Sequence, residues 1–213
     1  MAVTFLFGGP EKATRTILLA HGAGAPMDSP SLAATAEVLA AAGFQVARFE
    51  FGYMAGRRTE GRRTPPPRAE TLNPEYIAAV EALGAKGPLI IGGKSMGGRV
   101  ASMIADELFA AGKIRGLLCL GYPFHPLAKP EKLRTEHLVD LKTPTLIVQG
   151  TRDAFGSREE VSGYALSPMI EIQWLEDGDH DFRPRKKVSG LSAADHLKAM
   201  AKAVSIWVER IAS

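Results

Sequence analysis

Short apolar runs alternate along the chain with longer segments in which apolar residues recur at helical spacing. The runs that predict strands lie at 1–7, 17–20, 44–51, 88–91, 114–120, 145–149 and 170–175. The segments that predict helices lie at 29–42, 73–83, 96–111 and 192–211. Short strands separated by helices indicate βαβ units. We therefore expect an α/β fold with a mostly parallel sheet of about six or seven strands flanked by helices.

The segment 52–72 interrupts this alternation. It holds three consecutive prolines and five arginines, which are Arg57, Arg58, Arg62, Arg63 and Arg68. We expect a long basic loop here, and loops of this length in a compact domain are usually functional or mobile. The chain on either side of the segment continues one α/β pattern, so we expect residues 1–213 to form a single domain.

The run Gly93-Lys94-Ser95-Met96-Gly97 stands between a predicted strand and a predicted helix. A Gly-x-Ser-x-Gly pattern in this position is typical of a nucleophile elbow, a sharp turn that needs small flanking residues and exposes its serine. Ser95 is therefore the candidate nucleophile. A plain glycine-rich turn is one alternative. A phosphate-binding loop is another, but its pattern requires glycine at position 88, where this chain has Pro88.

A serine hydroxyl needs a base to activate it, and the base needs a carboxylate to orient it. His180 lies in a polar turn directly after the last predicted strand, and Asp153 follows the strand 145–149. The order along the chain, serine then acid then histidine, is the order that follows a nucleophile elbow. We expect His180 to be the base and Asp153 to be the acid.

Other side chains remain as alternatives to these three. The rival carboxylates are Asp177, Asp179 and Asp181. Neighbours of a histidine in a tight turn rarely meet its ring nitrogen with good geometry, which favours Asp153. His137 and His196 fall among charged neighbours in helical patterns, so we expect both at the surface. Cys119 lies in an apolar run and is expected to be a small buried side chain, not a second nucleophile.

The run His21-Gly22-Ala23-Gly24-Ala25 follows the strand 17–20. An oxyanion intermediate needs two aligned backbone N–H donors. We expect these to come from Ala23 and from Met96, the residue after the nucleophile. Gly22 is expected to contact the substrate. His21 is expected to be structural and to tie down the backbone of this loop.

Two further groups of residues are candidates for binding the substrate. The segment 121–126 follows the strand 114–120, and we expect Tyr122 and His125 in it to form a wall of the pocket. The basic segments 52–72 and 182–188 also follow predicted strands, whose ends rim the site in such a sheet. If they converge, Arg57 and Arg58 would attract an anionic substrate. A solvated loop whose charges serve solubility is the alternative.

These motifs together resemble those of α/β-hydrolases, and among them the small dienelactone-hydrolase-like proteins. The resemblance covers nearly the whole chain, from His21-Gly22 to Gly178-Asp179-His180. It implies hydrolysis of an ester or related acyl bond through an acyl-enzyme, with no metal and no cofactor. Dienelactone hydrolases proper use a cysteine nucleophile, whereas this chain has Ser95. About 24 residues separate Leu120 from Thr145, so we expect no large lid.

Composition restricts the remaining classes of function. A content of 46% hydrophobic residues excludes a mainly disordered chain, and a single cysteine excludes a disulfide framework and a cysteine-rich zinc site. No apolar run approaches the roughly 18 residues of a membrane span, and the first residues lack the basic segment of a signal peptide, so we expect a cytoplasmic protein. The net charge of +3 is by itself too small to indicate nucleic-acid binding. The basic segments also lack the interleaved aromatic residues on which bases would stack.

The sequence thus predicts a serine hydrolase that acts on a small acyl substrate, namely an ester, a thioester or a lactone. A non-catalytic interaction protein with the α/β-hydrolase fold, whose basic loops bind a partner, is the alternative. No particular oligomeric state is predicted.

Overall fold

The computed structural model describes residues 3–61 and 64–211. The strands in these residues are β1 (Phe5–Gly8), β2 (Thr16–Ala20), β3 (Gln45–Phe49), β4 (Leu89–Lys94), β5 (Gly116–Leu120), β6 (Thr145–Gly150) and β7 (Ile170–Leu175). In the described part of the chain they form one seven-stranded sheet in the order β1-β3-β2-β4-β5-β6-β7. β1 is antiparallel to β3, and the other neighbouring pairs are parallel. The expected mostly parallel sheet is therefore confirmed.

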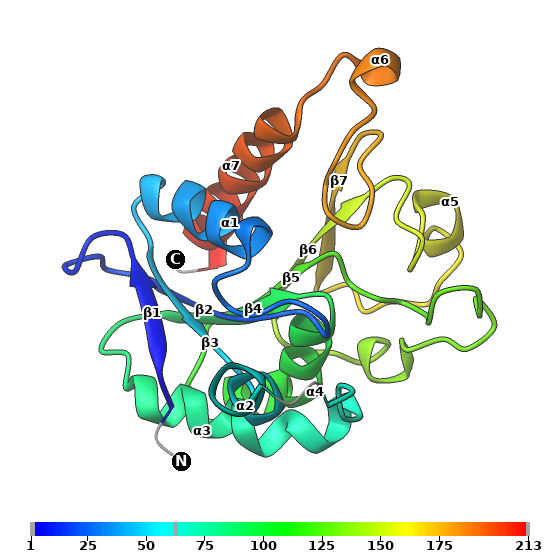
Figure 1. Cartoon of the computed structure of the whole chain (residues 1–213). Helices are drawn as coiled ribbons and strands as arrows, with labels where there is room; N and C mark the ends of the chain where they lie inside the picture. The colour runs from blue at the N-terminus through cyan, green and yellow to red at the C-terminus, as the bar shows by residue number, and fades with distance from the viewer. Residues whose placement is uncertain (1–2, 62–63, 212–213) are drawn as a thin grey trace.

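Helices cover both faces of this sheet (Figure 1). They are α1 (Pro30–Ala41), α2 (Gly52–Glu60), α3 (Asn73–Leu83), α4 (Met96–Ala110), α5 (Arg158–Val161), α6 (Lys186–Ser189) and α7 (Ala193–Ile211), with the 3-10 helices η1 (Ala69–Leu72) and η2 (Glu136–Leu138). α1 and α7 pack together on one face, and α3 and α4 pack together on the other. Between β5 and β6 the described residues form no other helix or strand than η2. The connection therefore holds no large lid over the ends of these strands, as expected.

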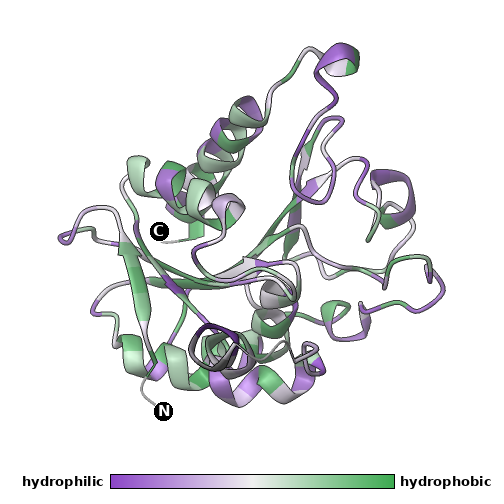
Figure 2. Ribbon diagram, in the orientation of Figure 1, coloured by the Kyte–Doolittle hydropathy of each residue, from purple (hydrophilic) through white to green (hydrophobic). Residues whose placement is uncertain are grey.

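Strand β2 shows how the sheet separates two hydrophobic cores. Side chains alternate between the faces of a strand, so Leu18 and Ala20 join the core beneath α3 and α4 while Ile17 and Leu19 join the core beneath α1 and α7. Figure 2 shows the apolar residues concentrated on the strands and on the helix surfaces that face them. A strand buried on both faces reads as a continuous apolar run, which is why β2 is recognisable in the sequence.

The segment 52–72 is not the long loop that its composition predicts. α2 occupies its first part and η1 its last part. Arg62 and Arg63, two of the arginines expected in that loop, lie outside the described residues. The sequence does not reveal α2 because glycines and consecutive arginines give no apolar stripe at helical spacing.

Contacts with other elements hold α2 in place. At its start the backbone N–H of Gly52 donates to Glu75 Oε2 on α3 at 2.6 Å. In its last turn the Arg58 guanidinium forms ion pairs with Asp28 at 2.9 Å and Glu50 at 2.7 Å. Short helices gain most of their stability from tertiary contacts, not from intrinsic propensity. α2 therefore exists because of the fold around it.

Candidate active site

Ser95 occupies a strained turn between β4 and α4. Its backbone has φ 51° and ψ −113°, a left-handed region that non-glycine residues rarely adopt. A Cβ at Gly97 would lie 2.6 Å from the carbonyl oxygens of both Ala20 and His21, so only glycine allows the end of β2 to approach this closely. The Ser95 N–H donates to the carbonyl of Leu120 at 2.9 Å and ties the turn to the end of β5. This geometry is that of the expected elbow.

Asp153 and His180 meet at the same edge of the sheet, from the loops after β6 and β7. Oδ2 of Asp153 accepts a hydrogen bond from Nδ1 of His180 at 2.7 Å. Asp153 is 0% exposed, and its carboxylate also accepts from Gln149 Nε2 at 3.0 Å and from the Phe155 N–H at 2.9 Å. These hydrogen bonds hold the Asp153 carboxylate against the imidazole of His180. The His180 side chain remains 23% exposed.

The rival carboxylates have other partners. Asp177 binds the guanidinium groups of Arg152 and Arg185, and Asp179 Oδ1 accepts the backbone N–H groups of Asp181 and Arg183.

Ser95 Oγ and His180 form no direct hydrogen bond in the described residues. Hydrogen bonds between nucleophile and base are often loose before substrate binds.

The loop after β2 is held by His21 and Tyr53. His21 Nδ1 donates to the Gly22 carbonyl at 2.6 Å, and His21 Nε2 accepts the Phe51 N–H at 3.2 Å. One ring nitrogen donates and the other accepts, so the ring is neutral, and burial lowers the pKa of His21 accordingly. The expected structural role of His21 is confirmed. The Tyr53 hydroxyl on α2 donates to the Ala23 carbonyl at 2.9 Å.

Gly22 and Met96 lie next to the elbow. A Cβ on Gly22 would lie 3.8 Å from Ser95 Cβ, so this loop passes directly beside the nucleophile. Met96 is the first residue of α4, and the first N–H groups of a helix have no partner within it. The backbone N–H groups of Ala23 and Met96 thus belong to two segments that flank Ser95.

Tyr122 and His125 do not form an open pocket wall, which corrects the expectation for both. Tyr122 is fully buried in the core, where its hydroxyl donates to the Arg134 carbonyl at 2.9 Å. His125 is also buried, with Nδ1 donating to the Pro126 carbonyl at 2.9 Å and Nε2 3.6 Å from Glu160. Residues that follow a strand can turn back into the core, and the sequence pattern does not distinguish this arrangement from an exposed wall of a pocket.

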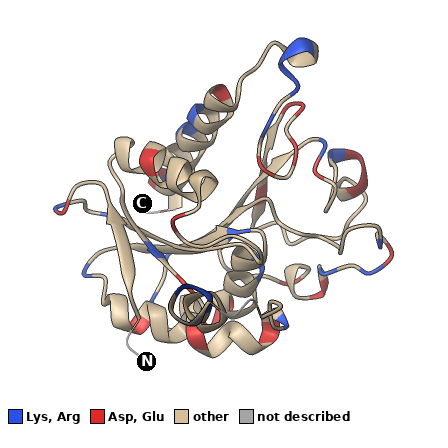
Figure 3. Cartoon of the chain, in the orientation of Figure 1, with Lys and Arg blue, Asp and Glu red and all other residues tan. Residues whose placement is uncertain are grey.

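The described residues of the two basic segments do not converge. Figure 1 places α2 and α6 far apart, and Figure 3 shows their basic residues in separate regions. Arg58 is neutralised by Asp28 and Glu50, and Arg57 donates to the Thr64 carbonyl and lies 5.4 Å from the Tyr53 ring centre. In the part of these segments that the structure describes, Arg57 and Arg58 therefore do not join the basic residues of 182–188 in an anion-attracting mouth.

Two histidines expected at the surface are buried to different degrees. His196 is buried, and its Nδ1 donates to the Phe182 carbonyl at 2.8 Å. His137 is half-buried, with Nε2 2.8 Å from Ser102 Oγ. Ser102 is buried within α4 and donates its own proton to the Arg99 carbonyl at 2.7 Å, so this second serine–histidine pair does not present a free nucleophile.

Sequence reasoning missed three residues that shape the site, namely Tyr53, Lys94 and Gln149. Lys94 precedes Ser95 directly, and its Nζ donates to the backbone carbonyl of His180. Gln149 Oε1 accepts the Tyr122 N–H at 2.7 Å, while its amide donates to Asp153. The position of Lys94 within the elbow was the one available signal, because residues beside a nucleophile reach the catalytic edge.

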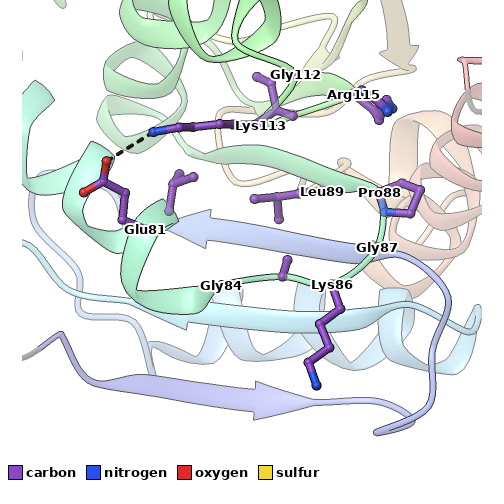
Figure 4. Close-up of a pocket in the computed structure, with 12 residues that line it drawn as sticks. Glu81, Gly84, Lys86, Gly87, Pro88, Leu89, Gly112, Lys113 and Arg115 are labelled. Atoms are coloured by element: carbon purple, nitrogen blue, oxygen red, sulfur yellow. Dashed lines mark hydrogen bonds and ion pairs between the residues drawn. The ribbon is translucent and has the colours of Figure 1, made fainter.

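A pocket of about 490 Å³ lies at the opposite edge of the sheet, near the starts of β4 and β5 (Figure 4). Lys113 and Glu81 form an ion pair across it at 3.2 Å. None of the candidate site residues lines this pocket. Among the described residues, no cluster of three or more histidine, cysteine or acidic side chains could hold a metal ion, and no helix is long and apolar enough to cross a membrane.

Comparison with known proteins places this geometry in context. A family model described as an alpha/beta hydrolase domain matches residues 13–209. A dienelactone hydrolase from Anabaena variabilis aligns with a TM-score of 0.72 at 22% identity, over 98% of this chain and 91% of its own. A lidless α/β serine hydrolase from Xanthomonas campestris aligns at 0.67 and 18%, over 98% and 88%. The esterase domain of a Rhodothermus marinus protein aligns at 0.66 and 15%, over 99% of both chains. At these identities the solved structures share the fold with this chain.

Proposed function

The chain belongs to the α/β-hydrolase family, and from that premise we propose that it is a serine hydrolase of ester-type acyl bonds. The observation that carries the proposal is the 2.7 Å hydrogen bond between His180 and the buried Asp153, at the sheet edge where Ser95 stands in its strained turn. A carboxylate that holds Nδ1 of an imidazole leaves Nε2 free to accept a proton. A serine nucleophile requires such a base to accept the proton of its hydroxyl.

In the proposed first step, Ser95 Oγ attacks the acyl carbon and its proton passes to His180 Nε2. The backbone N–H groups of Ala23 and Met96 stabilise the resulting oxyanion. Stabilisation of this kind is usually the largest single contribution to catalysis in such sites. His180 then returns the proton to the leaving alcohol or thiol, and Asp153 stabilises the imidazolium in between. Water then attacks the acyl carbon while His180 Nε2 takes its proton, and the bond to Ser95 Oγ breaks as His180 returns that proton to Ser95 and the acid leaves. The nucleophile, base and oxyanion donors all come from the chain, so this reaction uses no cofactor.

The experiment is labelling with a fluorophosphonate, combined with a screen over acyl p-nitrophenyl esters, thioesters and lactones. Ser95→Ala should remove both labelling and turnover, since loss of a nucleophile typically costs several powers of ten in rate. Ser102→Ala is the matched control, because Ser102 also lies close to a histidine, and it should retain labelling. An unlabelled wild-type chain without turnover would contradict the proposal and favour the non-catalytic interaction protein.

A further inference from the structure

The side chain of Lys94 connects the elbow of Ser95 to the loop that carries His180. Lys94 is the last residue of β4, and its Nζ donates a hydrogen bond to the backbone carbonyl of His180. Nζ also lies 3.7 Å from Asp181 Oδ1 and 5.3 Å from the centre of the Phe182 ring. The Lys94 side chain therefore contacts three successive residues, 180–182, of the loop that follows β7, which we call the histidine loop.

This contact crosses the edge of the sheet. β5 and β6 lie between β4 and β7, and neighbouring strands are about 4.8 Å apart, so the histidine loop must fold back over the strand ends to meet Lys94. Gly121, the residue after β5, makes room for the crossing. A Cβ there would lie 2.8 Å from Lys94 Nζ and 3.3 Å from His180 Cε1. The ammonium and the imidazole thus share one space above the end of β5.

The ammonium of Lys94 is buried at some cost. Its side chain is only 13% exposed, and burial lowers the pKa of Lys94, opposed by the charges of Asp181, Asp153 and Asp179. A buried ion pair is often no more stabilising than an apolar side chain of similar size. Stability alone therefore gives no reason for a lysine here, whereas its hydrogen bond to the histidine loop does.

We propose that Lys94 is a positioning residue that sets the place of the His180 ring relative to Ser95, through its hydrogen bond to the His180 carbonyl. This inference rests on the proposed function. Asp153 fixes the ring by Nδ1 from the loop after β6, and Lys94 fixes the main chain of the same residue from the end of β4. Lys94 directly precedes Ser95 in the chain. Its hydrogen bond to the His180 carbonyl therefore fixes the position of the proposed base relative to the proposed nucleophile.

The test is Lys94→Met, which removes the charge and the donor and keeps an unbranched apolar stem. A displacement of about 1 Å at a reacting centre can cost roughly 10²-fold in rate. We expect kcat on the best ester to fall by about that factor, the rate of fluorophosphonate labelling to fall in parallel, and KM to stay within roughly twofold. Lys202→Met, at an exposed lysine of α7, is the matched control and should behave as the wild type.

Chemical rescue separates positioning from a general loss of structure. In a Cys119→Ala background, Lys94→Cys is alkylated with bromoethylamine, which rebuilds a lysine-like ammonium, or with 1-bromopropane, which builds a neutral chain of the same length without a hydrogen-bond donor. We expect the first product to recover most of kcat and the second to remain impaired, at similar melting temperatures. Equal activity of the two products, or full kcat in Lys94→Met, would overturn the proposal. Loss of Ser95 labelling in Lys94→Met but not in His180→Ala would also overturn it, because Lys94 would then be the base.

A proton NMR measurement keeps this test independent of turnover. The His180 Nδ1 proton, identified by its loss in His180→Ala, should shift and exchange faster with solvent in Lys94→Met. An unchanged resonance would overturn the positioning role. If the wild type is neither labelled nor active, the proposed function fails, while this resonance still decides whether Lys94 orients the ring.

Discussion

Oδ2 of Asp153 lies 2.7 Å from Nδ1 of His180, although 27 positions separate the two residues in the chain. The carboxylate reaches this position from the end of β6, and Gln149 on the same strand donates to the same oxygen at 3.0 Å. Since Asp153 is fully buried, its charge is balanced by these hydrogen bonds and by the imidazole. The pair therefore forms one rigid unit, and its acid member can be tested separately from the neighbouring carboxylates.

Asp153→Asn should lower kcat by roughly 10²–10⁴-fold, because an amide in this place favours the wrong imidazole tautomer. Asp179→Asn is the comparison, since among the described residues the hydrogen bonds to the Asp179 carboxylate come from backbone N–H groups of its own turn. We expect Asp179→Asn to retain kcat within an order of magnitude. Steady-state kinetics on a p-nitrophenyl ester decides the point. The reverse ranking of the two variants would show that the acid is misassigned.

Tyr53→Phe should reduce kcat while leaving the fold intact. The Tyr53 hydroxyl donates to the carbonyl of Ala23 and so holds the residue whose N–H is the proposed oxyanion donor. Burial raises the pKa of Tyr53 to about 12, so its hydroxyl remains a donor at neutral pH. We expect a loss of roughly 3–10-fold in kcat, below the effect of removing an oxyanion donor itself, and of about 0.5–1.5 kcal/mol in the free energy of unfolding. The control is Tyr164→Phe, whose ring contacts Phe124. If Tyr53→Phe loses stability but keeps the wild-type kcat, the hydroxyl serves only the fold.

Salt should affect anionic and neutral esters alike. Arg58 is paired with Asp28 and Glu50, Arg185 is paired with Asp177, and the described basic residues of the two segments lie in separate regions, so their charges do not add up at one site. Exposed charges are screened beyond about 8 Å at physiological ionic strength. Values of kcat/KM for the two ester types, measured over a series of salt concentrations, should run in parallel. A steep loss for the anionic ester alone would mean that other cations attract it.

Asp177→Asn should destabilise the protein at neutral pH and not in strong acid. Hydrogen bonds from Arg185, with the charge of Arg152, lower the pKa of Asp177 to about 2 from its ordinary value of 3.8. A carboxyl group with a lowered folded-state pKa stabilises the fold above its unfolded pKa, and this contribution is lost as the pH falls toward the folded value. The stability difference between wild type and variant should therefore shrink between about pH 4 and pH 2.

Denaturant unfolding of the two proteins across that range measures the effect. Asp140→Asn, at an exposed aspartate, is the control and should follow the wild type at every pH. A difference between wild type and Asp177→Asn that is constant with pH would point to lost packing and not to the charge.

Local patterns in the sequence were sufficient to predict the mostly parallel sheet and the sharp turn at Ser95. The parallel strands are buried on both faces and appear as short apolar runs, as in Ile17–Leu18–Leu19–Ala20. The Ser95 turn is visible because its strained backbone and the close approach of β2 both require glycine at fixed offsets. In each case a single segment meets a steric or burial requirement that its own residues reveal.

Only the tertiary structure decided which polar side chains face the site. α2 depends on Glu75, Asp28 and Glu50 from other elements, so its own sequence resembles a loop. Tyr122 turns into the core and Lys94 reaches the loop after β7, and neither orientation is encoded by spacing along one segment. The physical reason is that hydrogen bonds and ion pairs between distant segments select these orientations, and such contacts exist only once the sheet has brought the segments together.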